Sequence, residues 1–385
     1  MKLRSIQFLR ALAILLVTYT HTLGFQEPFA TAYQQGFFCW EHIGAIGVDI
    51  FFVISGFIIT YSAGRYMGGR EGRRFLVNRF LRLIPAYYAA TLLYLGIELV
   101  HMIRVNAFGH ISFARVMNTI FLLPFFDRTQ YAEPLLTIAW TLSFEWLFYL
   151  FFFGAIFFSI RRKEWFLCGL IIVLVMAGRF FPMPDYRLSF LTNPILLEFL
   201  AGIIIYKIYA SSLLIKRSMA WLLLGAGIAM VVYEVFTGYG KVFAMDYTLD
   251  GQLSLTRFFI WGIPSALIVA GCLFLEKANP AGTTFTHRLI ALIGDASYSI
   301  YLTHFSVFGL LAAVYTRLGF FLPADLSVFV IWATTIIGGI LFYKVVEAPL
   351  LRRSKRHRHG GPDAHNHPEG PDAANRYSAS TNLPI

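Results

Sequence analysis

Charged residues are scarce in this sequence. Asp, Glu, Lys and Arg together make up 14% of its 385 residues, whereas a soluble domain carries about 25%. Hydrophobic residues make up 57%, and phenylalanine alone occurs 39 times. This composition excludes an ordinary soluble protein and predicts an integral membrane protein.

Cysteine is also rare, with three residues that are odd in number and far apart, Cys39, Cys168 and Cys272. This arrangement excludes a disulfide framework and a Cys-x-x-Cys metal pair. We therefore interpret the cysteines as buried packing residues and expect no metal site.

Acidic residues are outnumbered, 21 against 32 Lys and Arg, which gives a net charge of +11. Such an excess can indicate nucleic-acid binding, but here the basic residues occur in short clusters between apolar runs. This is the positive-inside pattern of a membrane protein, and no separate basic domain is present. We expect no nucleic-acid partner.

Long apolar runs are what the sequence has in abundance, and a helix needs about 20 residues to cross the hydrocarbon core. The predicted fold class is all-α, with about ten transmembrane helices around a central polar cavity. The predicted spans are residues 6–24, 44–64, 84–103, 135–159, 165–182, 191–210, 218–237, 257–275, 297–316 and 325–347. The first run resembles a signal peptide, but it contains Thr18 and His21, and Ala30-Thr31-Ala32 lies too far beyond it, so we predict an uncleaved span.

Residues 116–126 are apolar but too short to span, and Pro124 interrupts them, so we predict a re-entrant piece or half-helix. With ten spans and a cytoplasmic N-terminus, most basic residues fall on the cytoplasmic side. The exceptions are Arg104, Arg115, Arg128, Arg179, Arg187, Lys241, Arg257 and Arg317. A further span at 116–126 would move Arg161, Arg162 and the basic C-terminus outside. We therefore predict that both termini are cytoplasmic, in the inner (cytoplasmic) membrane.

The composition changes sharply near the C-terminus. After Leu351 the sequence is first basic, up to Arg358, and then rich in Gly, Pro, Asp, His, Asn and Ser. Segments of this kind lack the apolar residues needed for a core. We predict a transmembrane domain over 1–351 and a disordered cytoplasmic tail over 352–385, whose histidines we interpret as solvated.

Ionisable residues inside the spans are costly unless paired, which makes them candidates for function. Arg10 and His21 lie on one face of the first span, because eleven residues make three turns plus roughly 20°, and they are about 16 Å apart along the axis. The alternatives are an Arg10 that reaches the interface and a His21 that only packs. Arg79 and Arg82, three residues apart on the cytoplasmic side, form a pair suited to phosphate or, alternatively, a positive-inside anchor.

The other intramembrane candidates are spread over five spans. Asp49 requires a cation or several donors, or belongs to a structural pair. Glu145 shares a face with Thr141, and its predicted depth matches that of His21, so the two could form a His–Glu pair. His304 could line the same cavity or only bond a neighbouring helix. Glu198 and Glu347 are weaker candidates, and we expect Glu347 to pair with a basic residue.

Five segments in order resemble the membrane-bound acyltransferase-3 family, from about residue 4 to 352. They are RALAILLVTYTH, GVDIFFVISGFII, RFLRLIPAYY, WTLSFEWLFYL and SYSIYLTHF. The residue pattern of these segments is similar to that of the exopolysaccharide-modifying branch of the family. Many relatives have Ser where this sequence has Thr141, which keeps the hydroxyl.

The resemblance implies an O-acyltransferase that takes an acetyl or succinyl group from acyl-coenzyme A and passes it to a hydroxyl of a surface polysaccharide or lipid-linked sugar. Carried over residue by residue, it makes His21 the general base oriented by Glu145, with Asp49 as a third catalytic candidate. It implies that Arg10, Arg79 and Arg82 bind the donor. The remaining substrate-binding candidates are Trp140, Thr141, Tyr298 and His304.

Several alternatives stay open at this point. A covalent acyl-histidine can replace direct transfer. A proton-coupled transporter or flippase of a polysaccharide precursor could use the same buried groups as a relay, and an export scaffold is a third class. The acyl group, the acceptor and the membrane face of transfer stay open, as does a homodimer or a place in a polysaccharide-assembly complex.

Overall fold

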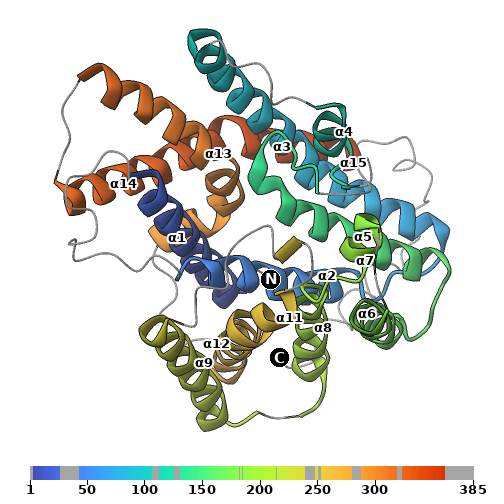
Figure 1. Ribbon diagram of the computed structural model, residues 1–385. Helices are drawn as coiled ribbons and strands as arrows, with labels where there is room; N and C mark the ends of the chain where they lie inside the picture. The colour runs from blue at the N-terminus through green and yellow to red at the C-terminus, as the bar shows by residue number, and fades with distance from the viewer. Residues whose placement is uncertain are drawn as a thin grey trace, which may run out of the picture.

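A computed structural model describes residues 3–26, 43–105, 112–124, 131–181, 183, 185–213, 215–238, 248–249, 253–279, 288–318 and 323–359 (Figure 1). Within these ranges all regular structure is helical. The elements are α1 (Arg4–Gln26), α2 (Ala45–Ala63), α3 (Gly69–Val105), α4 (Phe113–Phe121), η3 (Thr137–Ala139), α5 (Trp140–Phe157), α6 (Lys163–Phe180), α7 (Tyr186–Leu191), α8 (Leu196–Ala210), α9 (Arg217–Thr237), α11 (Ser254–Arg257), η5 (Phe258–Gly262), α12 (Ile263–Ala278), α13 (Arg288–Leu318), α14 (Ala324–Phe342), η6 (Tyr343–Glu347) and α15 (Ala348–His359).

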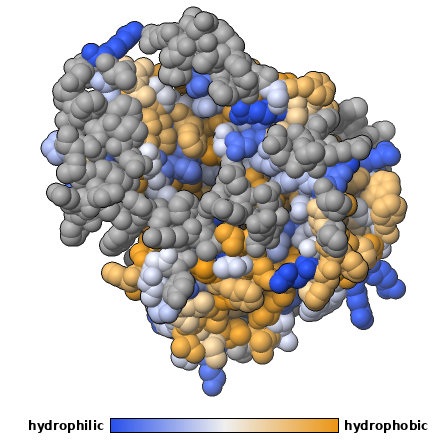
Figure 2. Space-filling model, viewed as in Figure 1, coloured by the Kyte–Doolittle hydropathy of each residue, from blue (hydrophilic) through white to orange (hydrophobic). Residues whose placement is uncertain are grey.

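The protein is an all-α integral membrane protein, as predicted. Nine helices in the described ranges are long and apolar enough to cross a membrane, and every predicted span coincides with a helix. The tenth helix, α6, has 18 residues and carries its charges, Lys163, Glu164 and Arg179, only in its first and last turns. In Figure 2 apolar surface covers the lower part of the view, where α9 and α12 lie in Figure 1.

The relative direction of α1 and α13 shows that α6 completes the set of spans. Gln7 is next to Gly294, Arg10 bonds Ser297, and the ring of His21 lies against His304. Residue numbers rise together on both helices, so the helices are parallel. Two parallel spans are separated by an odd number of crossings. Among the described residues the intervening long helices are α2, α3, α5, α6, α8, α9 and α12. If each of the other six crosses the membrane, the number of crossings is odd only when α6 crosses too.

Helix α1 lies at the centre because its neighbours approach its backbone very closely. A Cβ on Gly47 of α2 would lie 2.4 Å from the Ala13 carbonyl oxygen, and a Cβ on Gly294 of α13 would lie 2.3 Å from that of Gln7. Only glycine permits such contacts, which is how membrane helices gain packing energy where the hydrophobic effect is weak. Helix α14 closes the third side, and its Trp332 donates to the Leu15 carbonyl at 3.1 Å.

Three irregularities interrupt the long helices. Pro85 lies inside α3, and two π-helical turns, η5 and η6, interrupt the α11–α12 and α14–α15 runs. The π turns adjoin buried charged residues, since Arg257 precedes η5 and Glu347 ends η6. Turns of this kind are often found at functional sites.

Two short helices lie where the sequence predicts a half-helix and a domain boundary. The predicted half-helix at 116–126 corresponds to α4, whose 9 residues are too few to cross a bilayer. Ser112 caps its N-terminus and accepts a hydrogen bond from the Arg115 amide, and Leu122, in a left-handed conformation, follows its last residue. Helix α15 continues past the predicted domain boundary at 351 as far as His359. Residues 360–385 lie outside the described residues, so the division into two domains stays a prediction.

Candidate functional site

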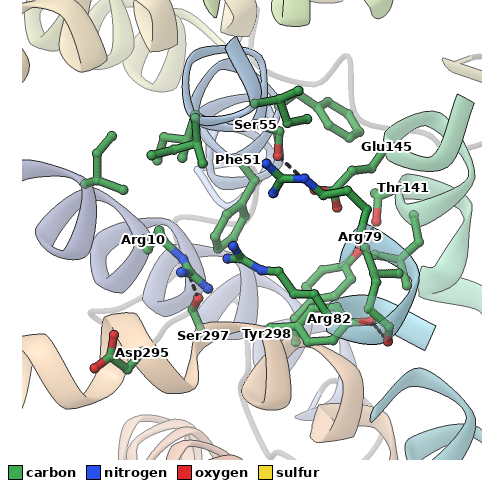
Figure 3. A pocket seen from close by; sticks show the side chains of 18 of the residues that line it. Arg10, Phe51, Ser55, Arg79, Arg82, Thr141, Glu145, Asp295, Ser297 and Tyr298 are labelled. Carbon is green, nitrogen blue, oxygen red and sulfur yellow. Dashed lines mark hydrogen bonds between the residues drawn. The ribbon is translucent and has the colours of Figure 1, made fainter. Parts of the chain in front are cut away.

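A polar cavity of about 560 Å³ lies between α1, α2, α3, α5, α13 and η6 (Figure 3). This is the central polar cavity that the sequence predicts. Its polar lining comprises Gln7, Arg10, Ser55, Asn78, Arg79, Arg82, Thr141, Glu145, Tyr149, Asp295, Ser297, Tyr298, Tyr301, Tyr343 and Glu347. A smaller cavity of about 190 Å³ adjoins it at Asn78, Arg79 and Arg82.

The three arginines predicted to bind the donor all line the cavity, but they are held differently. Arg10 donates to the Ser297 hydroxyl at 3.1 Å. Arg79 donates to Ser62 at 2.6 Å, and its guanidinium lies 5.4 Å from the ring centroid of Phe75 and 5.5 Å from that of Tyr149. Arg82 forms no hydrogen bond or ion pair with the described residues. Of the three, it is therefore the guanidinium most available to a ligand.

Carboxyl groups balance these cations. Glu145, Asp295 and Glu347 line the same cavity as the three arginines, so its formal charge is close to zero when all six groups are ionised. Glu347, which η6 turns into the cavity, accepts from the Ser299 hydroxyl at 2.5 Å. The structure shows no ion pair between Glu347 and a basic residue in the described ranges. The direct hydrogen-bond partner of Glu347 is Ser299, whereas Arg10 and Arg82 attract its carboxyl group at longer range across the cavity.

Glu145 lines the cavity but does not bond His21. One of its oxygens accepts from Ser55 at 3.0 Å and from Tyr149 at 2.5 Å. The helix register explains this. Thr20 of α1 bonds Gly44 of α2, and Gly47 packs on Ala13, so Ser55 lies near the level of Arg10 rather than of His21. Glu145 is consequently about 15 Å deeper than His21 along the bundle.

The predicted depth of Glu145 was wrong because it was counted from the start of the apolar run. The chain before α5 is already inside the protein, since Leu136, Ile138 and Ala139 are buried. A depth for Glu145 that is counted in residues from position 135 is therefore too small, because position 135 is itself already below the outer surface.

His21 has a different partner, His304 of α13. Their ring centroids are 5.0 Å apart, and Phe305 lies 5.3 Å from His21. His304 is fully buried and its Nδ1 is 2.6 Å from the Tyr301 carbonyl oxygen. The two histidines do not line the cavity themselves. His304 lies next to Tyr301, with ring centroids 5.8 Å apart, and at this end of the cavity the Tyr301 and Thr141 hydroxyls are 2.9 Å apart.

The remaining substrate-binding candidates divide into two groups. Thr141 and Tyr298 line the cavity, and the Tyr298 hydroxyl donates to the Leu83 carbonyl at 2.8 Å. Trp140 is buried outside it and packs edge-on against Phe52 and Phe144. We interpret Trp140 as a residue that positions α5 against α2.

Asp49, expected beside His21 and Glu145, lies in a separate buried cluster. Its Oδ2 accepts from Nη2 of Arg257 at 2.5 Å, and the two side chains are 0% and 3% exposed. The carboxyl of Glu198 lies beside that of Asp49, and neither Glu198 oxygen has a hydrogen-bond donor among the described residues. Asp49 is therefore not brought to the cavity, because Arg257 is its counterion.

Sequence reasoning missed Ser55, Tyr149 and Tyr301 as site residues and Arg257 as the counterion of Asp49. One signal was available for Arg257, since an Asp near the outer end of one span requires a cation at a similar depth, and Arg257 begins another span. Tyr149 follows Glu145 by four residues, so a helix brings their side chains together. Nothing in the local sequence distinguishes Ser55 or Tyr301 from packing residues.

Comparison with known proteins agrees with this architecture. Residues 3–343 match the acyltransferase domain of the acyltransferase-3 family. The exopolysaccharide production protein ExoZ of Rhizobium meliloti (strain 1021) is 32% identical over 320 residues, covering 82% of this chain and 92% of the relative. The acyltransferase MdmB of Streptomyces mycarofaciens is 26% identical, covering 93% and 94%.

A third relative is longer than this chain. The peptidoglycan O-acetyltransferase OatA of Listeria monocytogenes serovar 1/2a (strain ATCC BAA-679 / EGD-e) is 26% identical over 90% of this chain but only 56% of its own length, so the chain spans about half of it. No solved structure matches the chain significantly. The match over nearly the whole sequence shows that this protein belongs to the membrane-bound acyltransferase-3 family, which its motifs resemble.

Proposed function

We propose that this acyltransferase moves an acetyl or succinyl group from cytoplasmic acyl-coenzyme A to a hydroxyl of a surface polysaccharide or a lipid-linked sugar. One observation carries the proposal: a polar cavity extends from Arg82, which has no hydrogen bond among the described residues, to the Thr141–Tyr301 wall. His304 lies next to Tyr301, and His21 lies beside His304. The relatives support the substrate classes, since their names refer to exopolysaccharide production and to peptidoglycan O-acetylation.

The donor would enter with its phosphates at the arginine end. Arg82 is shared by both cavities and has no competing partner among the described residues, so its fork is free to bind a phosphate. Arg10 and Arg79 assist, although Ser297 and Ser62 already hold them. The three arginines and three carboxyl groups of the cavity cancel one another in formal charge when ionised. Selectivity for a polyanionic donor would therefore depend on direct contact with Arg82 more than on the overall charge of the cavity.

The thioester would then lie at the Thr141–Tyr301 end of the cavity, and this pair of hydroxyls would have to separate for the thioester to reach His21. His21 takes the proton of the sugar hydroxyl, whose oxygen attacks the thioester carbonyl carbon. The carbon–sulfur bond breaks, and the proton passes from His21 to the leaving thiolate. In the acyl-histidine alternative, His21 itself attacks the carbonyl and the sugar oxygen attacks afterwards.

Glu145 has a supporting role in this proposal. It holds Ser55 and Tyr149, and Tyr149 in turn covers Arg79. It thus keeps α2, α3 and α5 in the arrangement that shapes the donor end of the cavity. We place the protein in the inner (cytoplasmic) membrane with both termini in the cytoplasm, which puts Arg79 and Arg82 on the side where acyl-coenzyme A is available.

The experiment uses full-length protein in nanodiscs, acetyl-coenzyme A or succinyl-coenzyme A as donor, and methyl β-D-glucopyranoside as a soluble hydroxyl probe. Thiol release and donor binding are measured in the same samples. We expect donor binding and thiol release with one of the two donors. A proton-coupled transporter or flippase would neither bind nor consume the thioester, and that result would overturn the proposal.

A further inference from the structure

The hydrogen bond to Tyr301 determines the tautomer of His304. A carbonyl oxygen can only accept a hydrogen bond, so Nδ1 of His304, at 2.6 Å from the Tyr301 oxygen, must carry the proton. In the neutral imidazole, Nε2 is then an unprotonated acceptor. This atom is buried and has no partner among the described residues. A buried acceptor without a donor is uncommon and calls for an explanation.

The imidazole of His21 lies beside the ring that carries this acceptor. A direct hydrogen bond of about 2.9 Å between two ring nitrogens corresponds to a centroid separation of roughly 5 Å, because each nitrogen lies about 1.1 Å from its centroid. The observed separation is 5.0 Å. The rings thus have the spacing that a hydrogen-bonded pair requires, at an interplanar angle of 39°.

The apolar surroundings of the two rings increase the stabilising effect of such a hydrogen bond. Phe305 lies against both rings, and Phe308 lies 5.6 Å from His304. A proton taken up by His21 would therefore be a charge next to apolar groups, which is costly unless a hydrogen bond stabilises it. Glu145 cannot supply this bond from its position beside Ser55 and Tyr149.

We propose that His304 is the positioning residue of His21: Nε2 of His304 accepts a hydrogen bond from the N–H of His21, so that the second nitrogen of His21 faces the acceptor hydroxyl. This inference rests on the proposed function. During transfer His21 binds the hydroxyl proton, the bond to His304 strengthens as His21 becomes a cation, and the proton then leaves with the thiolate. His304 ends the cycle unchanged.

Two variants separate this role from packing. His304→Asn keeps a donor for the Tyr301 carbonyl but is too short to place an acceptor at the Nε2 position. His304→Gln places its amide oxygen close to that position. We expect His304→Asn to lower kcat on the order of 10²-fold with an unchanged KM for the donor, because orienting a general base contributes that much. His304→Gln should stay within about fivefold of wild type.

A second measurement does not require an acceptor. Only neutral His21 reacts with diethylpyrocarbonate, so the modification of the His21 peptide, followed by mass spectrometry, reports its protonation against pH. Loss of an acceptor that stabilises protonated His21 should move the midpoint to lower pH in His304→Asn but not in His304→Gln. Thermal unfolding of each variant in nanodiscs checks that the fold is kept.

Either of two results would overturn the inference: wild-type kcat and midpoint in His304→Asn, or equal losses in both variants with an unmoved midpoint, which indicates packing alone. The proposed function has its own control. Normal turnover in His21→Ala would overturn the function, whereas inactive His21→Ala together with active His304→Asn would overturn only the role of His304.

Discussion

Asp49 and Arg257 form an ion pair of 2.5 Å that is closed off from solvent inside the bundle. The pair joins α2 to the end of α11, and Glu198 of α8 lies beside it. Two ionised carboxylates and one guanidinium would leave an uncompensated charge in this cluster. Because Asp49 already pairs with Arg257, we expect Glu198 to be neutral and to serve as a reserve counterion for Arg257.

This arrangement predicts unequal effects of neutralising the three residues. Removal of one partner of a buried pair costs about 3–5 kcal/mol, and we expect a loss of that size in Arg257→Met. Asp49→Asn should cost less, because Glu198 can ionise in its place. The double variant Asp49→Asn/Glu198→Gln should be as unstable as Arg257→Met.

The Tm of purified protein in nanodiscs measures these differences. Glu198→Gln alone serves as the control and should change the Tm little, since a protonated carboxyl and an amide are similar in size and charge. An Asp49→Asn variant as unstable as Arg257→Met would show that Glu198 does not take over.

Arg82 is predicted to act on the nucleotide part of the donor. Arg82→Ala should raise KM for acyl-coenzyme A by roughly 10- to 150-fold, the equivalent of a charge-assisted hydrogen bond of about 1.5–3 kcal/mol. Its Tm should stay unchanged, because Arg82 bonds no described residue. With S-acylpantetheine, which lacks the nucleotide, wild type and Arg82→Ala should have the same KM.

The matched control is Arg217→Ala, which removes an exposed arginine at the start of α9. It should leave KM for both donors unchanged. An equal rise of KM for acyl-coenzyme A and S-acylpantetheine in Arg82→Ala would contradict a phosphate contact.

The sequence predicted the helices well and the contacts of the polar residues less well. Arg10 and His21 share a face because helical geometry fixes that relation locally, and both do face α13, at Ser297 and His304. The depth of Glu145 and the counterion of Asp49 depend on the register between helices far apart in sequence. Close glycine contacts such as Gly47 on Ala13 set that register, and no single-span pattern reveals them.

Substitutions of Thr141 test whether the end wall of the cavity takes part in the reaction. Its hydroxyl lies 2.9 Å from that of Tyr301, so Thr141→Val should lose about 0.5–1.5 kcal/mol, equivalent to roughly a 2- to 13-fold fall in kcat/KM. Thr141→Ser keeps the hydroxyl and should remain within about twofold of wild type by the same reasoning. Equal activities of the Val and Ser variants would remove Thr141 from the site.

The predicted topology can be tested with single cysteines. The chain has three cysteines, of which Cys168 and Cys272 are buried. In a variant with all three replaced by serine, we expect Ser378→Cys, near the C-terminus, to react with a membrane-impermeant maleimide only after the cells are opened. Labelling of intact cells would contradict a cytoplasmic C-terminus and the positive-inside reasoning behind it.

The central claim is that His21 carries out acyl transfer from a coenzyme A thioester. It is tested most directly by thiol release from acetyl-coenzyme A and succinyl-coenzyme A by wild type, His21→Ala and the tail variant His367→Ala, with donor binding recorded in the same nanodiscs. The account predicts release from one donor by wild type and His367→Ala, and donor binding with a fall in release on the order of 10²–10⁴-fold in His21→Ala. Wild-type release by His21→Ala would contradict it.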